Sequence, residues 1–180
     1  MTGIPPCRRV ATMHEHLLND GVFHVQLTSH AIENGQQIPA RFTEDGNNVS
    51  PPLSWREVPD NTEEFALLME DPDAPREDPW VHWVAYGIPA DRRELTEDIP
   101  KQETVADPPL LQGHNSFPKN NVGYRGPAPP RGHGRHRYYF RLFALDRRLD
   151  LAPDIDKKTL MNAIDGHVLD ESELMGTYVR

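Results

Sequence analysis

The sequence predicts a mainly β protein: an antiparallel β-sandwich with one or two short helices, one of them near the C-terminus. Three observations favour this fold class. The chain has 18 prolines among 180 residues, about twice the usual 5%. Short runs rich in β-forming residues lie between the proline clusters, which is typical of strands joined by rigid turns. Only one stretch, close to the C-terminus, has convincing helical spacing.

The expected strands are, in chain order, VFHVQLT (22–28), FALLM (65–69), WVHWVAYGI (80–88) and RYYFRLFALD (137–146). Between Tyr138 and Leu145 the last run is apolar on both alternating faces, apart from Arg141. We therefore expect this run to form a central strand covered on both sides.

The expected helix lies in DIDKKTLMNAID (154–165). Behind an aspartate N-cap, four apolar residues follow helical spacing: Leu160, Met161, Ile164 and Val168. Gly166 is placed where it can end the helix early. The chain length suits one core, so we expect a single domain over 21–180, preceded by a loose extension over 1–20.

Charge and cysteine content limit the partners. The formal net charge is −9 at pH 7 and the isoelectric point is near 5.4. An acidic surface repels nucleic acid and anionic membranes at long range, so neither is expected as a partner. No apolar run is long enough to span a bilayer. The one cysteine, Cys7, excludes an internal disulfide, and no signal peptide is recognisable, so we expect a cytoplasmic protein.

The segment GPAPPRGHGRHRY (126–138) is a cationic island in this acidic chain. Glycines allow close approach of the backbone to a ligand, prolines remove conformational freedom, and histidine and tyrosine supply directed hydrogen bonds. His136 and Tyr138 are two residues apart on a strand and therefore point to the same side. This combination suits an oxyanion. By itself, the segment fits a surface turn with solvated arginines better than a ligand site.

A second polar group lies in MEDPDAPREDPWVHW. Asp71 and Asp73 follow an expected strand and are fixed by neighbouring prolines, while His82 lies on the next strand. Buried charges at strand ends need partners. Each residue also has an ordinary interpretation, because Asp before Pro starts turns and a histidine between tryptophans is often a satisfied core residue.

Several stretches resemble the phosphatidylethanolamine-binding protein family, in particular its bacterial and archaeal branch of Raf kinase inhibitor-like proteins. The resemblance covers about Phe23 to Arg180 and is carried by IPARFTEDGNNVSPPLSW, EDPDAP, WVHWVAYGIP, YRGPAPPRG, HRYYFRLFALD and GHVLDESELMGTYVR. The DPDAP segment and the segment from GPAPP to HRY are the family's signature motifs, and they occur here in the family's order.

The resemblance implies a pocket for small anions such as phosphate, acetate or a phospholipid head group. The ligand-binding residues that it implies are Asp71, Asp73, Pro75, His82, Pro130, His136 and Tyr138. Ala128 departs from this branch, where a cysteine is common, which argues against a redox role. If Asp71 accepts a hydrogen bond from a histidine, the imidazole becomes a cationic donor, and affinity for phosphate should fall as pH rises.

Other functions remain open. Family members include kinase-pathway regulators and serine-protease inhibitors, so a protein kinase or serine protease is an alternative partner. A homodimer is also expected, with Tyr178 or the WVHWVAY strand as contributors. An acid–base hydrolase is a weaker alternative, because Ser116 lacks a supporting nucleophile motif. A metal site would use His133 and His136, with Asp71 or His82 completing the ligands. It rests on an H-x-x-H spacing alone, so no cofactor and no metal is expected.

Overall fold

The computed structural model describes residues 24–119 and 121–180. The expected extension over 1–20 lies outside these residues. The strands are β1 (Gln26–Thr28), β2 (Leu53–Arg56), β3 (Glu64–Asp71), β4 (Trp80–Pro89), β5 (Glu94–Leu95), β6 (Thr104–Ala106), β7 (Pro109–Gln112), β8 (His136–Leu145) and β9 (Val168–Tyr178). A 3-10 turn, η1, spans Ala40–Phe42, and the helix α1 spans Lys157–Ile164.

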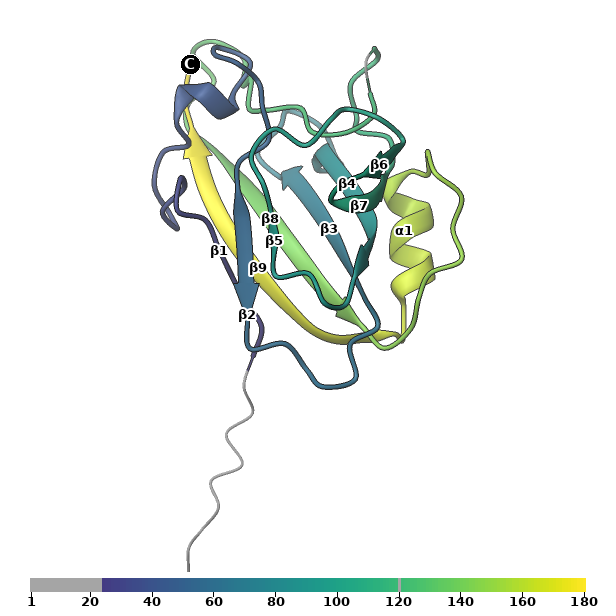
Figure 1. Cartoon of the computed structure of the whole chain (residues 1–180). Helices are drawn as coiled ribbons and strands as arrows, with labels where there is room; N and C mark the ends of the chain where they lie inside the picture. The colour runs from purple at the N-terminus through teal and green to yellow at the C-terminus, as the bar shows by residue number, and fades with distance from the viewer. Residues whose placement is uncertain (1–23, 120) are drawn as a thin grey trace, which may run out of the picture.

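Two antiparallel sheets form the sandwich (Figure 1). The small sheet has the order β1-β2-β5, and the large sheet has the order β6-β7-β4-β3-β8-β9. The expected fold class, a mainly β antiparallel sandwich with a C-terminal helix, is confirmed. The strand runs 65–69, 80–88 and 137–146 correspond to β3, β4 and β8, and within the described residues the first run is a strand only from Gln26.

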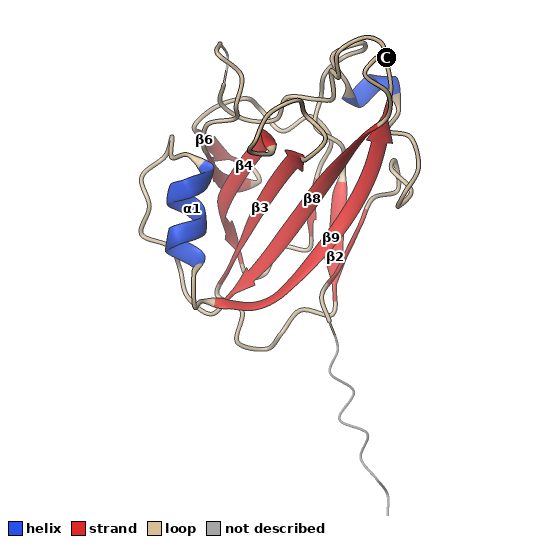
Figure 2. Ribbon diagram, turned by 180° about the vertical axis from the view of Figure 1, so that it is seen from behind, coloured by secondary structure: helices blue, strands red, loops and turns tan. Residues whose placement is uncertain are grey.

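The large sheet is covered on both faces. Alternate residues of β3 enter two apolar clusters: Phe65 and Leu67 pack between the sheets, while Ala66 and Leu68 pack on the opposite face. α1 supplies Leu160 and Ile164 to that second cluster and lies beside β3 and β4 (Figure 2). The two-sided burial explains why the sequence of β3 is a continuous apolar run.

β8 matches its expected place inside the sheet, between β3 and β9. On the face of the sheet that α1 covers, the buried residues of β8 are Phe143 and Leu145. Tyr139 and Arg141, nearer the start of the strand, remain partly exposed. The expectation of two covered faces therefore holds only for the C-terminal half of β8.

The helix begins as expected but ends earlier than the apolar spacing indicated. The Asp156 side chain accepts a hydrogen bond from the Thr159 backbone N–H (2.8 Å) and caps α1. The chain turns at Gly166, which has φ of 75°. Val168 is the first residue of β9 and is exposed, so its assignment to the helical stripe was wrong.

The expected dimer contributors are not free apolar surfaces. Tyr178 is buried and donates its hydroxyl to Asp45 (3.0 Å), and β4 lies inside the large sheet between β7 and β3. The homodimer stays a prediction. In the described part of the chain, no helix is both long and apolar enough to cross a membrane.

Candidate functional site

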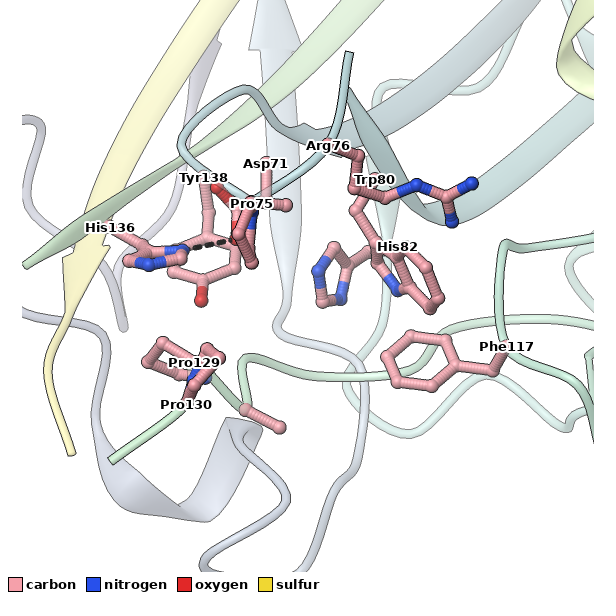
Figure 3. A pocket seen from close by; sticks show the side chains of 12 residues that line it. Asp71, Pro75, Arg76, Trp80, His82, Phe117, Pro129, Pro130, His136 and Tyr138 are labelled. Carbon is pink, nitrogen blue, oxygen red and sulfur yellow. Dashed lines mark hydrogen bonds and ion pairs between the residues drawn. The ribbon is translucent and has the colours of Figure 1, made fainter. Parts of the chain in front are cut away.

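A cavity of about 350 Å³ opens where β3 ends and where β4 and β8 begin (Figure 3). The turn after β3, the segment before β8 and a loop that carries Phe117 complete its walls. The lining residues are Asp71, Ala74, Pro75, Arg76, Trp80, His82, Phe117, Ala128, Pro129, Pro130, His136 and Tyr138. The two sequence motifs therefore meet in one site, because β3 pairs with β8 and brings their ends together.

Asp71 and His136 form a buried pair at the inner end of the cavity. Their side chains join through Asp71 Oδ2 and His136 Nδ1 at 2.7 Å, and both residues are almost fully buried (3% and 1% exposed). The second carboxylate oxygen, Oδ1, accepts the backbone N–H of Asp73 (2.8 Å). The carboxylate is thus satisfied within the protein, and it fixes the orientation of the imidazole.

Tyr138 follows His136 on the same face of β8. Its side chain is fully buried, and its hydroxyl has no hydrogen-bond partner. Burial raises the pKa of the phenol far above its ordinary value, and the nearby Asp71 charge adds to this effect. Tyr138 therefore stays a neutral O–H donor at physiological pH. A buried hydroxyl without a well-formed hydrogen bond costs folding free energy, and an acceptor that enters the cavity would remove this cost.

His82 lies across the cavity on β4, with its ring 5.2 Å from that of Tyr138 in an edge arrangement. Its Nδ1–H donates to the Arg125 carbonyl (2.5 Å). Burial lowers the pKa of His82 to about 4, although the Arg125 carbonyl and the Asp71 charge oppose the shift. His82 is therefore neutral at physiological pH, and its Nε2 carries a lone pair that can accept a proton donor.

The rim of the cavity is anchored to η1 and the segment that follows it. The Gly126 N–H donates to Asn48 Oδ1 (2.8 Å), and the Pro127 carbonyl accepts the Glu44 N–H (3.1 Å). These bonds hold the GPAPP segment so that Ala128, Pro129 and Pro130 face the cavity. Ala128 occupies a lining position with a methyl group.

The structure brings six of the seven expected site residues to the cavity: Asp71, Pro75, His82, Pro130, His136 and Tyr138. Asp73 lies outside. Its two carboxylate oxygens bind the Arg137 guanidinium at 2.8 and 2.9 Å, and Oδ2 also accepts the Arg137 backbone N–H at 2.8 Å. Asp73 therefore ties the turn after β3 to the start of β8.

Sequence reasoning missed part of the wall. Arg76, which follows the DPDAP motif directly, places its guanidinium over the Trp80 ring, 4.7 Å from the ring centroid. Phe117 packs edge-on against Trp80 and His82, with ring centroids 5.2 and 5.4 Å away. Trp80 and Arg76 flank recognised motifs, but Phe117 lies in a loop without any periodic pattern. No local signal identifies it.

The weaker alternatives also have definite positions. The Ser116 hydroxyl accepts the Val81 backbone N–H (3.0 Å) and holds the loop against β4. His133 pairs with His136 through ring nitrogens 2.7 Å apart. Across residues 24–119 and 121–180, no group of three or more His, Cys, Asp or Glu side chains is arranged to hold a metal ion.

A family model described as phosphatidylethanolamine-binding protein matches residues 28–179. The chain belongs to the phosphatidylethanolamine-binding protein family. The match includes both motifs that meet at the cavity, so the expected family is confirmed.

Relatives of this phosphatidylethanolamine-binding family member occur in archaea and bacteria. A UPF0098 protein of Methanothermobacter thermautotrophicus is 46% identical over 156 residues, covering 87% of this chain and 99% of the relative. A phosphatidylethanolamine-binding protein homologue of Chlamydia trachomatis has a similar structure, with a TM-score of 0.78, 37% identity and coverage of 88% and 99%. Escherichia coli YbcL has the same TM-score at 28% identity and coverage of 87% and 99%. These relatives confirm the bacterial and archaeal branch.

Proposed function

We propose that this family member binds small oxyanions in the cavity, with the phosphate group as its preferred ligand chemistry, either free or as part of a phospholipid head group. The observation that carries the proposal is the buried, unpartnered hydroxyl of Tyr138 beside the oriented imidazole of His136. Both residues line one cavity of about 350 Å³. An oxyanion would supply the acceptor that the hydroxyl lacks.

The electrostatics of the cavity support an anion that carries at least one proton. Apolar walls strengthen each charged hydrogen bond, because little water competes. Tyr138 offers an O–H, and His136 offers Nε2–H when protonated. Neutral His82 offers a lone pair, which suits the P–OH of a monoprotonated phosphate better than a fully deprotonated anion.

Binding rather than turnover is proposed because the titratable groups of the cavity are already held by partners. Asp71 accepts from His136 and Asp73, and His82 donates to Arg125. Among the described residues, the cavity lining contains no serine, threonine, cysteine or lysine that would serve as a nucleophile. We expect a protein that holds its ligand unchanged.

The test is a calorimetric titration with inorganic phosphate at about pH 6, using wild type, Tyr138→Phe and, as a control, His167→Ala at the far end of β8. Loss of one hydrogen bond to a charged ligand should weaken binding by roughly ten- to hundred-fold in Tyr138→Phe. The same variant should unfold with an equal or larger free energy, since it loses an unsatisfied buried hydroxyl. Unchanged phosphate affinity, or no binding by wild type, contradicts the proposal.

The source of the phosphate group is separated by a second titration with vesicles of phosphatidylethanolamine in a phosphatidylcholine background. If the protein binds the vesicles, and Tyr138→Phe weakens vesicle binding as much as it weakens phosphate binding, the ligand is a phospholipid head group. Phosphate binding without vesicle binding favours a free anion.

A further inference from the structure

Both ring nitrogens of His136 are already occupied. Nδ1 faces Asp71 Oδ2, and Nε2 lies 2.7 Å from Nδ1 of His133. The two imidazole centroids are 4.9 Å apart with the rings tilted by 62°. His133 itself is exposed and does not line the cavity. The nitrogen that an anion needs therefore already has a partner from the protein's own loop.

The hydrogen bond between the two histidines needs one proton between the facing nitrogens. The Asp71 carboxylate accepts from His136 Nδ1, so this nitrogen keeps its proton. The bond to His133 then forms if either His133 Nδ1 or His136 Nε2 carries a proton. When both nitrogens carry protons, two N–H groups of like charge face each other, and the bond is lost. The second proton opens the pair.

The charged surroundings of the pair differ on its two sides. His136 is faced by Asp71 at the end of β3, by the phenol of Tyr138 on its own strand, and by Tyr178, its register partner on β9. Two ion pairs lie near the histidines: Asp73 with Arg137, and Asp45 with Arg180 beside Gly132. Arg131 and Arg135 lie on the loop of His133, and His82 lies beyond Tyr138. Negative charge lies behind His136, and the loop of His133 is cationic. Protonation therefore favours release of His133 and entry of an anion.

The loop that carries His133 has a glycine on each side of the histidine. Gly132 and Gly134 flank the histidine with φ of 77° and 94°, and a side chain at either position would meet no atom within 4 Å. The loop is held by a turn bond from the His133 N–H to the Pro130 carbonyl (3.1 Å) and by a longer bond from the Gly132 N–H to the Arg180 carbonyl (3.5 Å). Two glycines in open space let the backbone rotate at small cost.

The second ligand donor lies under the neighbouring rim. The Tyr138 hydroxyl points toward the rim at Pro129 and Pro130 (Figure 3), and its oxygen is inaccessible to solvent. Movement of the loop that carries His133 would free His136 Nε2 for a ligand.

We propose that His133 blocks the anion site in the free protein by a hydrogen bond to Nε2 of His136, and that an incoming oxyanion displaces His133 from this position. This inference rests on the proposed function. In this role His133 is a specificity-determining residue. The bound state needs His136 as an imidazolium. The released His133 adds a second cation at the mouth of the cavity when it is protonated. Binding in wild type is then coupled to the uptake of up to two protons.

The test is a calorimetric titration with inorganic sulfate between about pH 5 and pH 8, since sulfate does not change its charge in this range. Wild type, His133→Ala and the remote control His167→Ala are compared. The slope of log affinity against pH reports the protons taken up with the anion. Wild type and His167→Ala should show a steeper slope than His133→Ala, in which only His136 can take up a proton.

The two profiles should cross. Near pH 8, His133→Ala should bind sulfate about fivefold more tightly than wild type, because no hydrogen bond has to be broken first. Near pH 5, the variant should bind no more tightly than wild type, because it lacks the second imidazole at the mouth of the cavity. A residue that only supported the loop would weaken binding at every pH when removed.

Two outcomes separate this inference from the proposed function. If wild type binds sulfate and the profiles of wild type and His133→Ala run parallel, the role of His133 is wrong while anion binding stands. If wild type binds neither sulfate nor phosphate at pH 5, both proposals are wrong. Imidazole nitrogen NMR of the free protein gives a direct check, because the His136 Nε2 resonance should change its titration in His133→Ala.

Discussion

Asp73 and Arg137 form a two-oxygen ion pair that joins the turn after β3 to the first residues of β8, with N–O distances of 2.8 and 2.9 Å. The Arg137 guanidinium holds the pKa of the Asp73 carboxyl below its usual value. The pair lies beside the cavity but not in its wall. It joins the turn after β3 to β8, while the pairing of β3 with β8 is what brings Asp71 beside His136.

Asp73→Ala should therefore act on stability more than on ligand binding. The exposed ion pair adds little because water screens it, and the lost acceptor of the Arg137 backbone N–H should lower the free energy of unfolding by about 1 kcal/mol. Phosphate affinity should change less than about threefold. Urea unfolding and calorimetry check both values. A loss of phosphate binding at unchanged stability would show that Asp73 contacts the ligand.

His82 should make the protein less stable in acid. Its pKa is about 4 in the folded state against 6.5 for an ordinary histidine. The unfolded chain therefore binds more protons between these values, so the contribution to stability is complete above about pH 6.5 and declines as pH falls toward 4. The loss should reach about 3 kcal/mol at pH 4.

The check on His82 is urea unfolding of wild type and His82→Gln at about pH 7 and pH 4. Glutamine can keep a donor for the Arg125 carbonyl but does not titrate. Carboxylates contribute to acid unfolding in both proteins, so the difference between the two profiles isolates His82. Profiles of equal slope would mean that His82 is not held neutral by burial.

Gly126→Ala should disturb the rim of the cavity. A methyl group at this position would overlap the Phe42 carbonyl oxygen and lie 2.8 Å from Thr43 Cα, and both contacts are with backbone. Such overpacking should cost about 1–3 kcal/mol of unfolding free energy. Phosphate affinity should also fall, because Pro129 and Pro130 follow this glycine closely in the GPAPP segment.

The matched control for Gly126→Ala is Gly35→Ala. Gly35 has φ of 81°, and a methyl group added there would have no atom within 4 Å, so only the backbone conformation is penalised, by about 1 kcal/mol. Gly35 is not among the residues that line the cavity. Equal phosphate affinities for the two variants would contradict the role of Gly126 in positioning the rim.

The strands that were predicted correctly can be recognised from apolar runs in the sequence. β3, β4 and β8 are apolar runs because the large sheet is covered on both faces along most of their length. β9 was missed for the opposite reason: it is an edge strand whose first half is mostly exposed and contains Asp170, Glu171 and Glu173. The first half of β9 is a strand because its backbone pairs with β8, and its side chains show no apolar periodicity.

The sequence by itself determined the β-sandwich class, an aspartate cap for the helix and the two motifs that supply the cavity, because these depend on local periodicity, turn chemistry and residue type. Only the tertiary structure decided that Asp71 binds His136 across 65 positions of sequence, that Asp73 instead binds Arg137, and that His133 occupies the remaining nitrogen. The physical reason is that such contacts depend on strand register. Register is set by packing across the whole sheet, and a shift of one residue in β8 would turn His136 to the other face and separate it from Asp71.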